Sequence, residues 1–171
     1  MNRSTRARAL RASALLAVAV ACSVPAAPLM ADINGFATGS GTGPTQYTLN
    51  GNQLPTVPAI DTGTNTLTIT TPNNNQASSA FYNTKQSVLN FTAEFDYTVT
   101  SGQPTADGFA FVLQNDPRGT AALGAGGGTL AYGGTGGITK SVALAADLYN
   151  GAGTSANPTR VGHAADGGGF A

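Results

Sequence analysis

Hydrophobic and polar side chains alternate most clearly between Asn90 and Thr100. Five apolar residues occupy every second position, and polar or acidic residues stand between them: Phe91, Ala93, Phe95, Tyr97 and Val99 against Asn90, Thr92, Glu94, Asp96, Thr98 and Thr100. A period of two residues places the two sets on opposite faces of a β-strand. The pattern therefore predicts a strand in a sheet that is buried on one face and solvated on the other.

A second strand is expected over 106–113, where large apolar side chains alternate with small ones. A short turn segment, 101–104, lies between the two runs, so we expect them to pair as antiparallel neighbours. Similar runs predict further strands at 47–49, 66–70 and 142–149, and an apolar segment at 80–82 follows a polar break at 73–79. Residues 115–119 indicate a turn and 124–137 a glycine-rich loop, whereas 151–171 show no periodicity and predict no element.

The first 31 residues have the pattern of a secretory signal peptide. Four arginines precede an apolar stretch at 14–21, and small residues follow up to Ala31. The apolar stretch is too short to cross a bilayer, so we expect cleavage after Ala31 and a mature chain without a transmembrane segment. That chain would be secreted, periplasmic or attached to the cell surface. The alternative is lipoprotein processing, with cleavage before Cys22.

Charge and composition of the mature chain narrow its possible functions. Residues 32–171 contain eight acidic and four basic residues, a net charge of −4. This balance argues against a nucleic-acid partner, because such binding requires clustered Lys and Arg. The single cysteine lies in the signal peptide, so no disulfide is expected after cleavage. A composition rich in Gly, Thr, Asn and Ala suits an all-β secreted domain, and it also suits an adhesive surface protein.

Several blocks of the chain resemble the legume-type (L-type) lectin family. In sequence order they are Ser79–Tyr82, Phe91–Asp96, Ala106–Phe111, the glycine loop and Val142–Asn150. The resemblance implies an all-β, concanavalin A-like β-sandwich of the legume-lectin (jelly-roll) type, incomplete at its C-terminus because family members continue with further strands. It divides the chain into a signal peptide (1–31), a lectin-like domain (32–150) and an unstructured Gly/Ala-rich remainder (151–171).

In this family, the aspartate of an Ala-Asp-Gly motif accepts hydrogen bonds from sugar hydroxyls, and a backbone N–H of the glycine loop donates to the same sugar. The resemblance assigns these roles to Asp107 and Gly127, with Gly126 and Gly128 as alternatives, and implies a cis peptide bond between Ala106 and Asp107. The residue types agree with this chemistry, because a carboxylate acceptor beside an amide donor matches two neighbouring hydroxyls. An ordinary Asp-Gly turn is the alternative.

The family also binds a transition metal and calcium through a Glu-x-Asp-x-Tyr-x-Asn segment. Asp147 and Tyr149 match this segment, but Ala145 replaces the glutamate and Asn150 stands one residue early. The resemblance therefore implies at most a single Ca²⁺, held by Asp147, the Tyr149 carbonyl and Asn150, because hard cations need the missing carboxylate charge. Asn150 is also implied in carbohydrate binding. The alternatives are that Asp147 only caps a strand and that His163, a candidate for the metal shell, is simply solvated.

These features together predict non-catalytic carbohydrate binding. A structural or adhesive surface protein without sugar binding is one alternative. A laminarinase-type glycoside hydrolase is the enzymatic alternative, since such enzymes share the sandwich and use a Glu-x-Asp-x-x-Glu strand. Glu94 and Asp96 match its beginning, but Val99 occupies the position of the last glutamate. We therefore expect no enzymatic activity, and the sequence leaves the sugar and the oligomeric state open.

Overall fold

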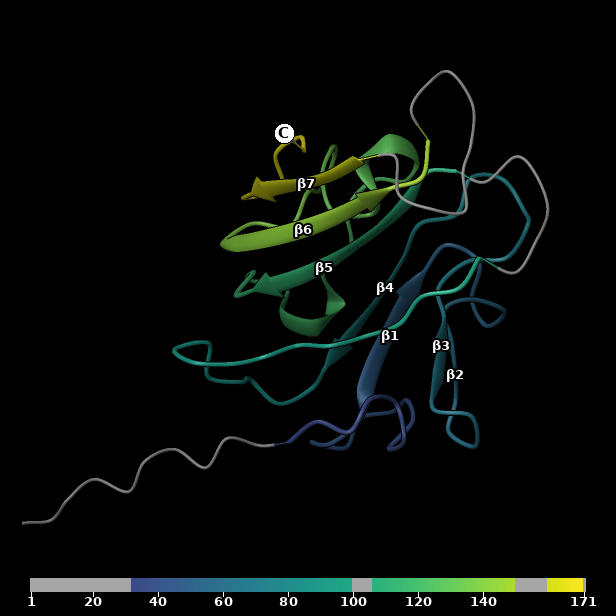
Figure 1. Cartoon of the computed structure of the whole chain (residues 1–171), viewed down its shortest axis with the longest axis vertical. Coiled ribbons are helices and arrows are strands. Elements are labelled where there is room, and N and C mark those ends of the chain that lie inside the picture. The colour runs from purple at the N-terminus through teal and green to yellow at the C-terminus, as the bar shows by residue number, and fades with distance from the viewer. Residues whose placement is uncertain (1–31, 100–105, 150–159, 171) are drawn as a thin grey trace, which may run out of the picture.

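The structure, a computed structural model, describes residues 32–99, 106–149 and 160–170. Within these ranges the regular structure is mostly strand, and the helical part consists of two short 3₁₀ turns (Figure 1). None of the described helices has the length and apolar character needed to span a membrane. The predicted all-β class is thus confirmed. The signal peptide with Cys22, the turn predicted at 101–104 and Asn150 lie outside the described residues.

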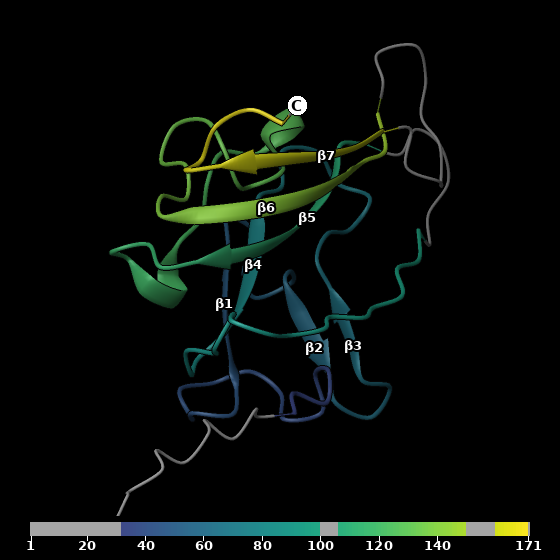
Figure 2. The ribbon, with the colours of Figure 1, turned by 60° about the vertical axis from the view of Figure 1, so that its left-hand side comes forward.

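Seven strands among the described residues form three antiparallel sheets. The first pairs β1 (Tyr47–Gly51) with β4 (Ser78–Tyr82), and the second pairs β2 (Ala59–Asp61) with β3 (Thr66–Thr68). The third contains β5 (Gly108–Gln114), β6 (Ser141–Asp147) and β7 (Arg160–Ala165), in that order. The turns η1 (Gly119–Ala121) and η2 (Gly127–Thr129) lie between β5 and β6 in the chain. In Figure 2 the strands of the third sheet run across the direction of β1 and β4.

The core lies between one face of the third sheet and the glycine loop. Its buried members are Ala122, Tyr132, Ile138, Ala143 and Ala164, and Phe81, Ala110, Val112 and Phe170 pack against them. The strands contribute mainly small side chains to this face, which lets the loop approach the sheet closely. The hydroxyl of Tyr132 lies 2.9 Å from Ser141 Oγ, so the buried phenol has a hydrogen-bond partner.

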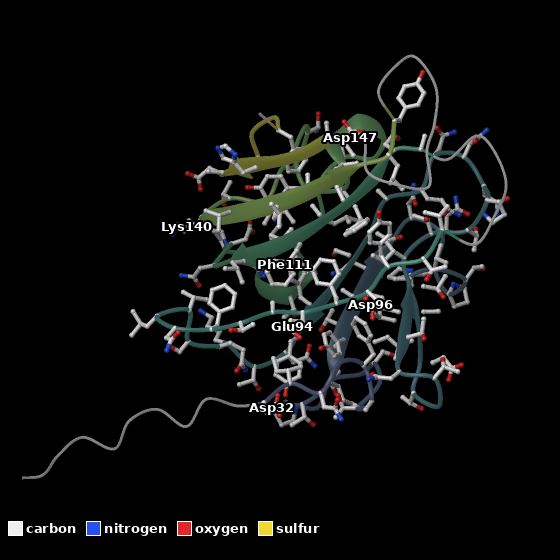
Figure 3. The ribbon with its side chains drawn as sticks, in the orientation of Figure 1. Asp32, Glu94, Asp96, Phe111, Lys140 and Asp147 are labelled. Atoms are coloured by element: carbon white, nitrogen blue, oxygen red, sulfur yellow. The ribbon has the colours of Figure 1, made fainter. Side chains whose placement is uncertain are left out.

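The prediction of a strand over Asn90–Thr100 is wrong for the part that the structure describes, residues 90–99. Residues 91–99 lie outside every described sheet, and Figure 3 shows Glu94 and Asp96 of this segment near Phe111 of β5. The ring of Phe95 lies 6.0 Å from the rings of Phe109 and Phe111, and the ring of Tyr97 lies 5.0 Å from that of Phe109. The segment packs across β5 through side chains instead of pairing beside it through the backbone. The alternation of apolar and polar residues in this segment therefore reflects the packing of its side chains against the third sheet.

The prediction that 151–171 contain no element is wrong for residues 160–165, which form β7. This strand pairs with β6 in a register that places His163 opposite Leu144 and Ala164 opposite Ala143. The sequence of β7, Arg-Val-Gly-His-Ala-Ala, has a single large apolar residue and therefore gives little hydrophobic alternation. Backbone pairing with β6 forms the strand, and the side-chain pattern does not reveal it. The other predicted strands coincide with β1, β3, β5 and β6 to within two residues at each end, whereas β2 and β4 were not predicted as strands.

Candidate carbohydrate-binding site

Asp107 lies directly before β5, next to the first residue that pairs with β6. Gly108 stands opposite Asp147 in the ladder, and the Asp107 carbonyl accepts a hydrogen bond from the Leu148 N–H at 2.8 Å. The peptide bond between Ala106 and Asp107 is cis, as expected. The side chain of Asp107 is half-buried. The strand pairing therefore holds this carboxylate in place at one end of the sheet.

Gly108 is required by close approach of the two strands. Its φ is +144°, a conformation that L side chains rarely adopt. A Cβ at this position would lie 2.1 Å from the carbonyl oxygen of Ala146. The close approach of β5 and β6 therefore requires glycine at position 108, a steric requirement that an ordinary Asp-Gly surface turn would not have.

The glycine loop brings Gly127 next to the carboxylate of Asp107. A Cβ built on Gly127 would lie 3.8 Å from Asp107 Oδ2. The three atoms nearest to a Cβ built on Gly126 belong to Gln76 and Ala77 and not to Asp107, and apart from its chain neighbours nothing lies within 4 Å of a Cβ built on Gly128. Among the three alternatives, the geometry therefore favours Gly127 as the neighbour of the carboxylate.

Internal hydrogen bonds hold the glycine loop in one conformation despite its low-complexity sequence. The Leu130 N–H donates to the Gly127 carbonyl at 2.9 Å, and the Ala131 N–H donates to the Ala125 carbonyl at 2.8 Å. The hydroxyl of Thr129 donates to the Ala125 carbonyl at 2.6 Å. These bonds fix the backbone around Gly127, so the N–H groups of the turn are pre-organised.

Asp116 and Arg118, which the sequence analysis placed only in a turn, anchor this loop. The buried Asp116 carboxylate accepts hydrogen bonds from Arg118 Nε at 2.8 Å and from the Thr139 N–H at 2.7 Å. The Arg118 guanidinium also donates to the carbonyls of Gly136 and Gly137 at 2.8 and 2.9 Å. Hydrogen bonds from the Arg118 side chain, together with those from the Arg118 and Thr139 N–H groups, hold the pKa of Asp116 well below its ordinary value. The Asp-x-Arg spacing was the available sequence signal for this ion pair, because residues 32–171 contain only four Lys and Arg.

Asp107 and Gly127 together present an acceptor and a donor. No described residue donates a hydrogen bond to the Asp107 carboxylate, and no acceptor for the Gly127 N–H lies within the described ranges. Gly127 is exposed, whereas Asp107 is half-buried. A carboxylate in this position accepts hydrogen bonds from neutral donors such as hydroxyls more strongly than a neutral oxygen would.

The two described residues proposed for calcium, Asp147 and Tyr149, lie at and just after the end of β6, where Asp147 stands opposite Gly108. Asp147 is half-buried, and its Oδ1 accepts a hydrogen bond from the Tyr149 N–H at 3.0 Å. Ala145, where the family has a glutamate, is 1% exposed and carries no ligating atom. His163 lies on β7, and among the described residues no group of three His, Cys, Asp or Glu side chains comes together. Since Ca²⁺ takes about six to eight oxygen ligands, these residues do not by themselves fit a calcium ion.

Comparison of the chain with family models, with curated proteins and with solved structures finds no match. The resemblance to L-type lectins therefore stays a prediction that rests on the motifs.

Proposed function

We propose that this protein is a secreted, non-catalytic carbohydrate-binding protein of the lectin type, built on a concanavalin A-like β-sandwich. The observation that carries the proposal is the position of Asp107 beside Gly127, two residues far apart in sequence that the resemblance paired for sugar binding. The close approach at Gly108 and the bonds within the glycine loop support it, because both hold this pair in a defined geometry.

In the proposed complex, Asp107 accepts hydrogen bonds from two neighbouring hydroxyls of a sugar ring, and the Gly127 N–H donates to one of their oxygens. The half-buried position strengthens these bonds relative to bulk water. Asn150, which lies outside the described residues, remains a proposed third contact. No step of this binding requires a metal, and calcium assistance through Asp147, Tyr149 and Asn150 is a separate hypothesis.

The substitution Asp107→Asn tests this proposal, with Asp96→Asn as the matched control. Asp96 is an exposed aspartate on the segment 91–99, next to Glu94 and outside every described sheet (Figure 3). Binding to a glycan array, followed by titration calorimetry with the best sugar, should show a loss of about tenfold or more for Asp107→Asn, because a hydrogen bond to a charged group contributes about 1.5–3 kcal/mol. Asp96→Asn should bind like the wild type. A wild-type protein that binds no glycan, or equal losses in both variants, would contradict the proposal.

The enzymatic alternative has less support. Glu94 and Asp96 are exposed on a segment outside every described sheet, and Val99 takes the place of a third carboxylate. A retaining glycosidase needs two carboxylates facing one sugar at about 5 Å. We therefore propose binding without catalysis. An adhesive protein without sugar binding is the outcome if the glycan array stays negative.

A further inference from the structure

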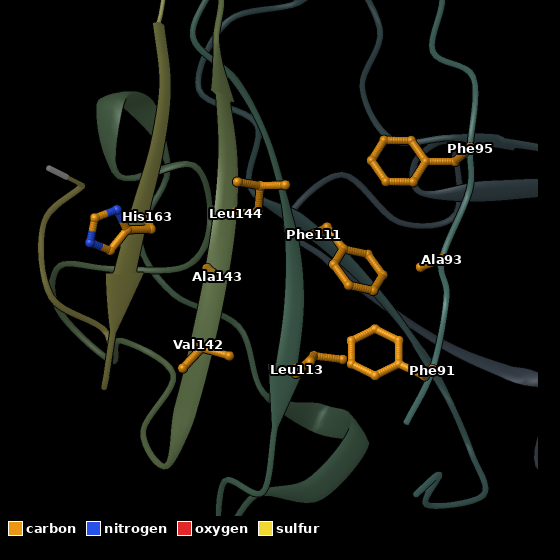
Figure 4. Close-up of a pocket in the computed structure, with 9 residues that line it drawn as sticks. All are labelled: Phe91, Ala93, Phe95, Phe111, Leu113, Val142, Ala143, Leu144 and His163. Carbon is orange, nitrogen blue, oxygen red and sulfur yellow. The ribbon is translucent and has the colours of Figure 1, made fainter. Parts of the chain in front are cut away.

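The face of the third sheet opposite the core is only partly covered. The segment 91–99 covers β5 through its aromatic rings, but on β6 the side chains of Val142 and Leu144 remain 54% and 51% exposed. Between the segment and the sheet lies an apolar crevice of about 360 Å³. Figure 4 shows Phe91 and Phe95 on one side of this crevice, Val142 and Leu144 on the other, and Phe111 between them.

The backbone along one wall of the crevice has the properties of a strand without a neighbour. Residues 91–96 alternate apolar and polar side chains as a strand does, yet no backbone hydrogen bond joins them to another described residue. Such a stretch offers N–H and C=O groups to an incoming strand, and the main-chain ladder is what provides affinity in β-strand addition.

We propose that the segment 91–96 and the crevice bind an extended peptide segment of a partner protein. The partner pairs with residues 91–96 as a β-strand, about 4.8 Å away. Its alternate apolar side chains then point toward the third sheet and cover Val142 and Leu144, in the same way that Phe95 covers Phe111.

The negative charges of the segment 91–96 indicate which polar residues its partner peptide should carry. The outer face of the segment carries Glu94 and Asp96, which are exposed. In a paired strand, the partner's polar side chains stand beside these two carboxylates, so Lys or Arg is favoured there. A second copy of this chain fits less well in the register centred on Phe95, because antiparallel self-pairing there would place Glu94 of each copy opposite Asp96 of the other, and like charges directly opposite are destabilising. The favoured occupant is therefore a segment of alternating apolar and basic residues.

A pair of synthetic peptides tests this proposal with the full chain. Both alternate Val with a charged residue, Lys in one and Glu in the other, and each carries one Trp. Because the chain contains no Trp, the peptide fluorescence reports binding directly. We expect the Lys peptide to bind the wild type about fivefold more tightly than the Glu peptide, and the double variant Glu94→Lys/Asp96→Lys to reverse the preference.

Two leucines with the same exposure provide the control for the crevice. Leu144 and Leu54 are each 51% exposed, but only Leu144 lines the crevice. Leu144→Ser should weaken binding of the Lys peptide, whereas Leu54→Ser and Asp107→Asn should leave it unchanged. Equal binding of both peptides, no binding of either, or equal effects of the two leucine substitutions would overturn the proposal. A dimer in sedimentation that the Lys peptide does not dissociate would overturn it in favour of self-pairing.

Discussion

At the scale of single residues, the site depends on two glycines, Gly108 and Gly127, which are required for different structural reasons. Gly108 lies where β5 and β6 approach so closely that a Cβ would meet the Ala146 carbonyl. Gly127 adopts a left-handed conformation, with φ of +68°, and an added Cβ would make only an ordinary contact with Asp107. The first glycine therefore serves strand pairing, and the second serves the shape of the loop that faces the carboxylate.

Gly108→Ala should be strongly destabilising. The added methyl group forces the strands apart and imposes an unfavourable φ, which together should lower the free energy of unfolding by about 2 kcal/mol or more. Urea denaturation followed by circular dichroism measures this change. Gly128→Ala is the matched control, because nothing lies within 4 Å of its Cβ position, and its effect should be neutral or slightly stabilising. Equal losses in both variants would mean that the close approach at Gly108 is absent.

Removing divalent cations should affect glycan binding less than Asp107→Asn does. Asp107 touches the sugar directly in the proposed complex, whereas the described residues near Asp147 supply too few oxygens for calcium by themselves. Titrations of one sugar in the presence of chelator and in the presence of calcium give the comparison. If the chelator abolishes binding completely, a calcium site completed by residues such as Asn150 is part of the sugar site.

At the scale of elements, the Asp116–Arg118 pair joins the turn after β5 to the glycine loop. Arg118→Lys keeps the charge but removes the planar fork that reaches the Gly136 and Gly137 carbonyls, so it should lower the free energy of unfolding by about 1–2 kcal/mol. It should also weaken glycan binding, because the loop carrying Gly127 loses its anchor. Thermal unfolding and calorimetry measure the two effects. Full stability with full binding would show that the loop needs no such anchor.

The same pair predicts a dependence of stability on pH. The pKa of Asp116 is lowered in the folded state, so its contribution to stability is present above its unfolded pKa of about 3.9 and is lost as the pH falls toward the folded value. Asp116→Asn removes this titration. The difference in unfolding free energy between the wild type and this variant should therefore be constant near neutral pH and shrink below about pH 4. If the difference in unfolding free energy between the wild type and Asp116→Asn stays constant down to pH 2, the predicted titration of Asp116 is wrong.

Hydrophobic periodicity predicted elements well only where large side chains mark one face. The runs containing Phe109 and Phe111, or Val142 and Leu144, coincide with β5 and β6. Periodicity missed β7, whose Gly and Ala residues pair through the backbone, and it overpredicted 90–100, whose alternation indicates contact across layers. The resemblance to L-type lectins paired Asp107 with Gly127. The Asp-x-Arg spacing indicated at most a local ion pair between Asp116 and Arg118, and it did not indicate that Arg118 holds the glycine loop, because the carbonyls that it reaches there are distant in sequence.

At the scale of the whole molecule, polar contacts connect the first sheet to the turn that precedes the glycine loop. Asn50 of β1 donates from Nδ2 to Ser79 Oγ at 3.0 Å and to the Thr120 carbonyl at 2.7 Å. Ser79 of β4 in turn donates to the carbonyl of the core residue Ala122 at 2.9 Å. Phe81 of the same strand packs on the core beneath the third sheet. These links predict that the first and third sheets unfold together.

Asn50→Ala tests that cooperativity. Loss of the half-buried amide should reduce the free energy of unfolding by about 1–2 kcal/mol, and amide hydrogen exchange should then accelerate by about five- to thirtyfold in β6 as well as in β4. Thr66→Ala is the control, because the exposed hydroxyl of Thr66 bonds only to the nearby Thr64 carbonyl, and it should leave both strands unchanged. If Asn50→Ala accelerates exchange in β4 alone, the two sheets are separate folding units. The sheet that carries Asp107 would then be stable without the first sheet.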